Sequence, residues 1–454
     1  MEFTAINPAN GEKLKTYPGW NAAHLEQALA ASAEAAPAWG TRPLSERSTL
    51  MQRAGEVLLQ HRDEYAGLMS REMGKLIGEA RAEIEKCSRC CAYYAEHGAA
   101  LLADEPAATD AVKSYVAYQP LGTVLAIMPW NFPFWQAIRA AAPALTAGNT
   151  MVLKHADNVP GCGLALEQVF REAGFPAGVF QTLMIGIPEI EAVIKDARIA
   201  AVTLTGSERA GRAVGQEAGA VLKKCVLELG GSDAFVVLED ADLARAAEVG
   251  VKSRFQNAGQ SCIAAKRFIV TDKIADAFLK EFTVRTQALR TGDPLDEKTT
   301  LAPLARLDLR DKLHAQVEDA VAQGARLALG GAPQPGKGAF YPPTILDGVG
   351  PGMRAWSEEM FGPAASIIRV PDEDAALAAA NSSSYGLGGS VWTRDLKRSE
   401  TFARRLQSGS AFVNGMVKSD PRLPFGGVKN SGYGRELSRH GILEFTNVKT
   451  VWIE

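Results

Sequence analysis

The chain has 454 residues, of which 46% are hydrophobic and 22% are charged, and its net charge is −3. This length exceeds what one hydrophobic core usually supports, so we expect two or three domains. The charge balance argues against a basic face large enough to bind a nucleic-acid backbone. The sequence also lacks a signal-peptide pattern and any run of about 18 apolar residues. We expect a cytoplasmic protein without nucleic-acid or membrane partners.

The first hundred residues have a helical pattern. Asn21 is a predicted N-cap for the segment that follows it, and a longer amphipathic pattern covers residues 45–73. A cluster of three cysteines lies in the next helical stretch: Cys87, Cys90 and Cys91. No second cysteine pair accompanies this cluster, so we interpret its members as partly buried helical thiols and expect no metal site.

After Gly122 the pattern changes to apolar runs that alternate with helical segments. The runs "TVLAIM", "TMVLK", "GVFQTLM" and "IAAVTLTG" have the spacing of βαβ units, which predicts a parallel sheet. A second alternation begins near Asp233 with "AFVVLED" and "RFIVTD". The pattern therefore predicts two α/β domains.

The glycines do not form the usual nucleotide-binding fingerprints. No G-x-G-x-x-G is present, and "GSERAG" at 206–211 lacks the Lys-Ser/Thr of a phosphate loop. However, Gly206 and Ser207 lie between an apolar strand and a predicted helix, where free amides and the helix dipole favour a pyrophosphate. A plain strand-to-helix turn explains these residues equally well.

Residues suited to covalent chemistry occur in three short segments. "PWNFPFW" contains Asn131, an amide donor for an oxyanion; "LELGGSD" contains Glu228 at a strand end; "FQNAGQSCI" contains Cys262 among small polar residues. A thiol, a carboxylate and an amide donor are the minimum set for acyl chemistry. Each residue taken alone also has a structural explanation.

Six ordered motifs together resemble the aldehyde dehydrogenase superfamily over essentially the whole chain: "PWNFP", "LTGS", "ELGG", "NAGQSC", "EEMFGP" and "PFGGVKNSGYGRE". The resemblance implies an α/β fold with a Rossmann-type cofactor domain (1–101 and 121–230) and an α/β catalytic domain (231–437). It also implies a small β-hairpin oligomerisation element (102–120 and 438–454), and hence a homodimer or homotetramer.

The resemblance also implies the catalytic roles. Cys262 is the expected nucleophile toward an aldehyde, the Asn131 amide and the Cys262 N–H hold the oxyanion, and Glu228 activates the water that hydrolyses the thioester. Glu436 matches a carboxylate that some members use for proton relay, although we expect an exposed glutamate at a helix start.

Further family positions imply a nicotinamide cofactor. The expected cofactor-binding residues are Trp130, Lys154, Asp157, Gly206, Ser207, Glu359 and Phe361. A carboxylate at Asp157 accepts the adenosine ribose hydroxyls and repels a 2′-phosphate, so we expect NAD to be used better than NADP, with measurable NADP activity.

The details of the sequence are most similar to bacterial succinate-semialdehyde dehydrogenases. Arg139 and Ser419 match residues that hold the far carboxylate of that substrate, whereas Gln256 replaces a second arginine often found there. The expected reaction is oxidation of succinate semialdehyde to succinate. A broad-specificity aldehyde dehydrogenase is the main alternative.

Three functions of other classes are disfavoured by the residues present. A non-catalytic member would lack Cys262, Glu228 or Asn131, and a coenzyme-A-acylating member generally lacks the glutamate at 228. A thiol hydrolase would require a histidine beside the cysteine, and none of the six histidines lies in a suggestive motif.

Overall fold

The apolar runs after Gly122 form a mainly parallel sheet, as predicted, in a computed structural model that describes residues 1–454. Its strands in spatial order are β19 (Gly432–Tyr433), β9 (Lys224–Glu228), β8 (Ile199–Thr205), β5 (Thr123–Met128), β6 (Thr150–His155) and β7 (Phe180–Thr182). Only β19 is antiparallel to its neighbour. β5 and β6 are buried at every position, which explains the apolar runs 124–128 and 151–153 within them.

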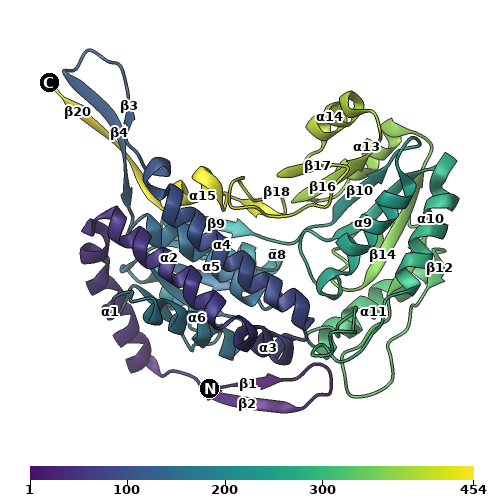
Figure 1. Ribbon diagram of the computed structural model, residues 1–454, viewed down its shortest axis with the longest axis horizontal. Helices are drawn as coiled ribbons and strands as arrows, with labels where there is room; N and C mark the ends of the chain where they lie inside the picture. The colour runs from purple at the N-terminus through teal and green to yellow at the C-terminus, as the bar shows by residue number, and fades with distance from the viewer.

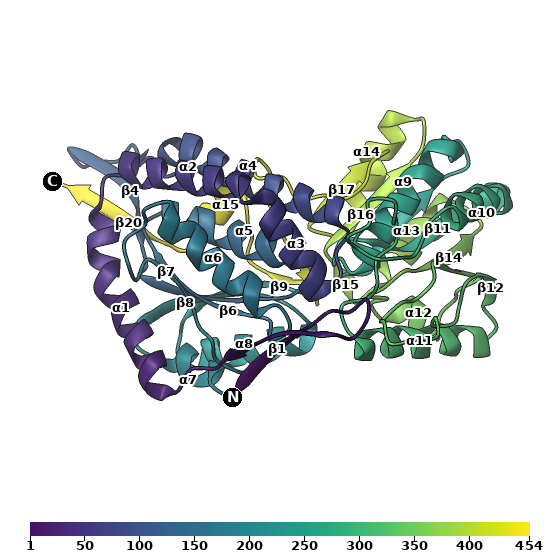
Figure 2. The ribbon, with the colours of Figure 1, turned by 60° about the horizontal axis from the view of Figure 1, so that its bottom comes forward.

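Helices cover both faces of this first sheet (Figure 2). They are α1 (Ala22–Thr41), α2 (Leu44–Gln60), α3 (Arg62–Met73), α4 (Ile77–Leu101), α5 (Pro133–Thr146), α6 (Pro160–Glu172), α7 (Ile190–Lys195), α8 (Glu208–Ala220) and α15 (Ser438–Glu444). One core contains side chains of α2 to α6, the other contains side chains of α7 and α8, and α1 contributes to both. No helix is both long and apolar enough to cross a bilayer.

The second predicted alternation forms a separate sheet. Its strands in spatial order are β12 (Arg326–Leu329), β13 (Thr344–Asp347), β14 (Ala364–Val370), β11 (Ala265–Thr271), β10 (Asp233–Val237), β16 (Gly388–Trp392) and β17 (Ser410–Val413). Its helices are α9 (Leu243–Phe255), α10 (Asp272–Gln287), α11 (Leu307–Ala322), α12 (Arg354–Ser357), α13 (Glu373–Asn381) and α14 (Leu396–Arg405). Helices α9 and α10 pack on one face of the sheet, and α11, α13 and α14 pack on the other.

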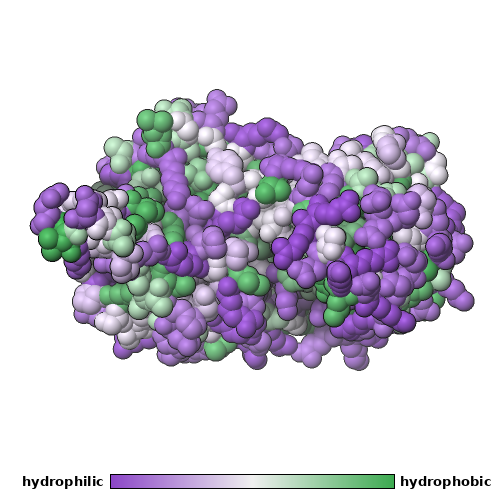
Figure 3. All heavy atoms as spheres, turned by 90° about the horizontal axis from the view of Figure 1, so that it is seen from above, coloured by the Kyte–Doolittle hydropathy of each residue, from purple (hydrophilic) through white to green (hydrophobic).

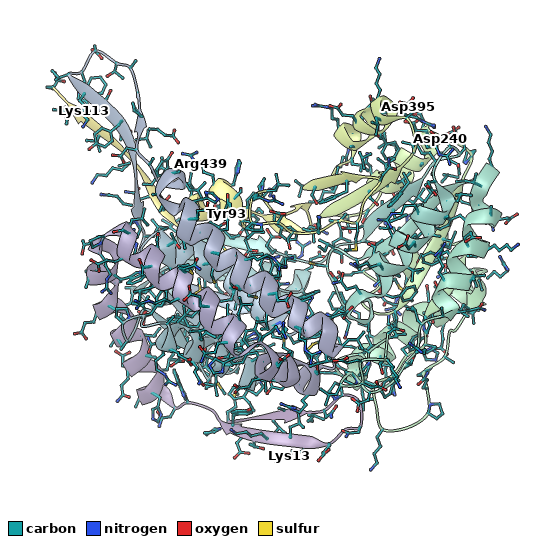
Figure 4. The ribbon with its side chains drawn as sticks, in the orientation of Figure 1. Lys13, Tyr93, Lys113, Asp240, Asp395 and Arg439 are labelled. Carbon is teal, nitrogen blue, oxygen red and sulfur yellow. The ribbon has the colours of Figure 1, made fainter.

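A third sheet forms an arm that projects from the first body (Figure 1). It pairs β4 (Lys113–Pro120) with β20 (Thr446–Ile453) on one side and with β3 (Glu105–Pro106) on the other. Figure 4 labels Lys113 on the arm and Arg439 at its base. Arg439 forms an ion pair with Glu105 and donates to the Tyr118 hydroxyl at 3.1 Å, which ties α15 to the arm.

Two expectations for the first hundred residues are wrong. Residues 1–18 form a hairpin, β1 (Glu2–Ile6) and β2 (Lys13–Pro18), and not a helical segment. The two strands have only five and six residues, so their alternation of exposed and less exposed side chains is too short to stand out in the sequence. The expected helix 45–73 is divided at His61, where α2 ends and α3 begins. The Asn21 cap is confirmed, since its side chain accepts from the His24 N–H at 3.0 Å.

The connections between the sheets place their edges against each other. β9 ends at Glu228 and β10 begins at Asp233, so the carboxyl ends of the first sheet meet the amino ends of the second. In the first sheet the chain order switches between β5 and β8, which are neighbours. Ligands of open α/β sheets bind outside the carboxyl ends at such a switch point. The fold therefore predicts a site between the two bodies.

A candidate active site between the two sheets

The loop that ends in the cysteine has a strained backbone. Three consecutive residues have positive φ: Asn257 (53°), Ala258 (51°) and Gly259 (73°). Such angles are uncommon for non-glycine residues and persist only where the surroundings enforce them. Both carboxylate oxygens of Glu79, on α4, accept from the Asn257 N–H at 3.0 to 3.1 Å, and the Arg254 guanidinium donates to the Gly259 carbonyl at 2.6 Å. The loop is thus fixed by two separate helices.

Lys266 fixes the cysteine itself. Its ammonium donates to the carbonyl oxygens of Ser261 and Cys262 at 2.8 Å each, and it lies 3.3 Å from the Glu359 carboxylate. The backbone of Gly231 packs so closely that a Cβ there would lie 2.5 Å from the Cys262 carbonyl oxygen. These contacts hold the thiol at the junction of the two sheets.

Asn131 reaches the same loop from the turn between β5 and α5. Its Nδ2 donates to the Gln260 carbonyl at 3.0 Å, and the Asn257 side chain donates back to the Asn131 carbonyl at 2.8 Å. Glu83 on α4 accepts from two amides in the first turn of α5, those of Phe134 and Trp135, at 2.9 Å each. An amide nitrogen has two N–H groups, so Asn131 retains one for an oxyanion.

One pocket, of about 320 Å³, extends from Cys262 along the carboxyl ends of the first sheet. Five of the predicted cofactor-binding residues line it: Trp130, Gly206, Ser207, Glu359 and Phe361. The rings of Trp130 and Phe361 meet edge to face, with centroids 5.8 Å apart. Ser207 is the N-cap of α8, so the strand, turn and helix predicted there are confirmed. Arg306 and Lys312 also line the pocket, and neither residue stands in a motif that marks it as functional.

The other two predicted cofactor residues lie farther from the cysteine. Lys154 at the end of β6 is buried and forms an ion pair with Asp157, which is exposed. Both line an open pocket of about 760 Å³ beside the β1–β2 hairpin, together with Arg306 and Lys337. Arg306 lines both pockets, so they adjoin. Aromatic rings near the thiol, a helix N-terminus and these cations suit a nicotinamide dinucleotide.

A second, smaller pocket of about 120 Å³ reaches Cys262 from the opposite direction. All three predicted substrate-binding residues line it: Arg139, Gln256 and Ser419. Lys86 on α4 also lines this pocket, and sequence reasoning missed it because a single lysine in a helical pattern usually lies in solvent. Its ammonium donates to the Ser419 hydroxyl at 2.7 Å.

Arg139 belongs to a group of buried charges. The side chain is 2% exposed, forms an ion pair with Glu436, lies 4.6 Å from the Phe425 ring and donates to the Thr205 hydroxyl at 3.3 Å. The expectation of an exposed helix-start Glu436 is therefore wrong: this residue is 3% exposed and precedes α15. The sequence could not reveal that an arginine about 300 positions earlier balances its charge.

Burial also governs the two predicted reacting groups. Burial raises the pKa of the Cys262 thiol to about 12, although the charges of Arg139 and Lys266 act in the opposite direction. Burial, and then the charge of Glu436, raises the pKa of Glu228 well above its usual range. Neither oxygen of Glu228 has a hydrogen-bond partner, and a Cβ on Gly426 would lie 2.6 Å from one of them. The Cys262 thiol is therefore predominantly neutral in the free protein at pH 7.

The cysteine cluster lies elsewhere and has no metal-site geometry. Cys87, Cys90 and Cys91 are fully buried on α4. Burial raises the pKa of each thiol. No group of three or more His, Cys, Asp or Glu side chains is arranged to hold a metal ion.

Comparison with known proteins agrees with this geometry. The chain matches the model of the aldehyde dehydrogenase family over residues 1–451. It is 50% identical to succinate semialdehyde dehydrogenase (NAD(P)+) Sad of Escherichia coli, covering 99% of this chain and 97% of that protein. It is 48% identical to a probable succinate-semialdehyde dehydrogenase (NADP(+)) of Synechocystis over 100% of both chains.

Solved structures give the same result. Succinic semialdehyde dehydrogenase from Streptococcus pyogenes, solved with NADP+ as the cofactor, matches with a TM-score of 0.97 and 38% identity over 99% of both chains. Gox0499, in a structure concerned with cofactor and substrate selection, matches with a TM-score of 0.98 and 41% identity over 100% of both. The chain belongs to the aldehyde dehydrogenase family.

Proposed function

We propose that this protein oxidises succinate semialdehyde to succinate with NAD(P)+. The main support is the position of Cys262, which lines both a pocket suited to a nicotinamide dinucleotide and a smaller pocket that contains cations. A thiol between these pockets can bind an aldehyde carbon from one side while a hydride acceptor lies on the other. The substrates named for the relatives from Escherichia coli and Synechocystis support the same reaction.

In the proposed mechanism the sulfur of Cys262 attacks the aldehyde carbon and the thiol proton passes to solvent water. The resulting oxyanion accepts hydrogen bonds from the free N–H of Asn131 and from the Cys262 backbone N–H. Trp130, Ser207, Glu359 and Phe361 would hold a nicotinamide cofactor, which would supply the acceptor for the hydride of the substrate carbon. The carboxylate form of Glu228 then removes a proton from the water that attacks the Cys262 thioester. The carbon–sulfur bond breaks, succinate is released, and the proton returns from Glu228 to the sulfur to regenerate the thiol.

We propose that both NAD and NADP serve as cofactor and that Asp157 sets their ratio. Its carboxylate disfavours a 2′-phosphate, which is the reason to expect a preference for NAD. However, Lys154 partly neutralises Asp157, and Arg306 and Lys337 line the same pocket. The relatives are named for NAD(P)+ or NADP(+). These observations weaken the predicted NAD preference and favour dual use.

The projecting arm supports self-association into a homodimer or homotetramer. Its exposed residues include apolar side chains: Val112 (84% exposed), Val448 (62%), Trp452 (45%) and Ile453 (45%). Figure 3 shows apolar residues among hydrophilic ones on this arm. Sedimentation analysis of the purified protein tests the assignment, and a monomer at micromolar concentration contradicts it.

An initial-rate survey tests the reaction. Succinate semialdehyde and butanal are compared, each with NAD and with NADP, and Cys262→Ala serves as the inactive control. We expect kcat/KM for the semialdehyde to exceed that for butanal at least tenfold, because a charge-assisted contact contributes about 1.5–3 kcal/mol. Equal values for the two aldehydes would instead support the broad-specificity alternative.

A further inference from the structure

Three cations line the substrate pocket. Lys418 is exposed, and the other two, Arg139 and Lys86, differ in how their charges are balanced. Arg139 is paired with the buried carboxylate of Glu436. Lys86 has no carboxylate within ion-pairing distance, and its one hydrogen bond is to the neutral Ser419 hydroxyl. An ammonium has three N–H donors, so two of them have no protein acceptor. Of the two cations that are not exposed to solvent, Lys86 is therefore the one whose charge the protein leaves unbalanced.

Neighbouring side chains hold Lys86 in place. Its nitrogen lies 4.1 Å from the centre of the Trp135 ring and 2.7 Å from the Ser419 oxygen, and both of these residues line the same pocket as Cys262. Burial, and then the charge of Arg139, lowers the pKa of Lys86 to about 8. A bound carboxylate would supply the counter-charge that the protein itself does not.

We infer that Lys86 is the main specificity-determining cation for the far carboxylate of the substrate, with the Ser419 hydroxyl as its hydrogen-bonding partner. This inference depends on the proposed function, because it names the group that selects a semialdehyde acid over a neutral aldehyde. It also explains how the pocket can bind a carboxylate although Gln256 stands where a second arginine is often found, because α4 supplies another cation. Arg139 then stabilises the buried Glu436 in addition to lining the pocket.

The test compares Lys86→Met with Lys86→Arg and with a matched control, Arg89→Met, which removes an exposed cation from the same helix. For Lys86→Met we expect kcat/KM for succinate semialdehyde to fall about 10- to 100-fold, mainly through KM. The loss with butanal should be less than threefold. Lys86→Arg should retain most of the preference, and Arg89→Met should leave it unchanged.

A pH profile of the wild-type enzyme adds a readout that does not depend on any variant. The ratio of kcat/KM for the semialdehyde to that for butanal cancels titrations shared by both reactions. We expect the ratio to be highest below pH 8 and to fall above it, because an amine binds a carboxylate strongly only when protonated. In Lys86→Arg it should stay flat to pH 10. The charged and titratable groups around Lys86 are Arg139 on α5 and Glu83, Cys87 and Cys90 on its own helix.

The outcomes separate the two proposals. If the wild-type enzyme does not prefer the semialdehyde, the proposed function is wrong. If it does, and Lys86→Met keeps that preference, the inference about Lys86 is wrong and the function stands. Should Lys86→Met fail to fold, the wild-type and Lys86→Arg pH profiles decide: a ratio that is flat in both contradicts the inference.

Discussion

Replacing Glu228 with glutamine tests the two-step mechanism. Glu228 is 2% exposed, and neither of its oxygens has a partner, so the amide of glutamine fits the same space without breaking a hydrogen bond. Acylation and hydride transfer precede the step assigned to Glu228. We therefore expect a burst of reduced cofactor near one per active site. Steady turnover should then be about 10²- to 10⁴-fold slower, the usual contribution of a general base.

The same variant has a predictable effect on stability. The pKa of Glu228 is raised in the folded protein, so at neutral pH the folded state opposes an ionisation that the unfolded state permits. Glu228 therefore lowers the free energy of unfolding at pH values above its unfolded pKa of about 4.3, and it has no such effect below that pH. Glu228→Gln should therefore be at least as stable as the wild type at pH 7, and the two should converge near pH 4.

Rapid mixing with saturating NAD(P)+ and substrate measures the burst, and mass spectrometry of the quenched variant detects acylated Cys262. Thermal unfolding between pH 4 and 8 measures stability, and Cys262→Ala is the control that should show no burst. If turnover is lost without acylated Cys262, the deacylation role of Glu228 is refuted. If Glu228→Gln unfolds at a lower temperature than the wild type at pH 7, the buried Glu228 carboxyl group does not destabilise the folded state at that pH.

Single residues of the site support three further predictions. Alkylation of Cys262 by iodoacetamide in the free enzyme should accelerate about tenfold per pH unit from pH 7 to 9, because the thiolate fraction follows a pKa of about 12, and a plateau below pH 9 would contradict this. In Asp157→Ser, the ratio of kcat/KM for NADP to that for NAD should rise about 3- to 30-fold as the repulsion of a 2′-phosphate disappears, and an unchanged ratio would exclude Asp157 as the determinant. Glu79→Ala removes the acceptor of the Asn257 N–H, so it should lower the unfolding free energy by about 1–3 kcal/mol and should also lower kcat. Glu79→Gln keeps one acceptor and should lower both quantities less. Calorimetry and turnover measurements of the two variants test this order, and the reverse order would contradict it.

The sequence alone indicated the repeated local pattern and three residues suited to covalent chemistry. Strands buried on both faces are mainly apolar, so β5 and β8 are recognisable as largely apolar runs in the sequence. Cys262, Asn131 and Glu228 stand in ordered motifs whose resemblance to one family is specific, and the family is confirmed. The β1–β2 hairpin was missed because its strands have only five and six residues, and so short an alternation gives little signal.

Only the tertiary structure decided how charges far apart in the sequence are balanced. Glu436 is buried because Arg139 lies beside it, whereas Lys86 retains an unbalanced charge because α4 places it against Ser419 and Trp135. The energy of a buried charge depends on its counter-charge and on its exposure to water, and neither is a property of the residue or of its neighbours in sequence. The sequence therefore indicated which residues could react, and the packing of α4 and α5 against the cysteine loop decided which cation is available to a substrate.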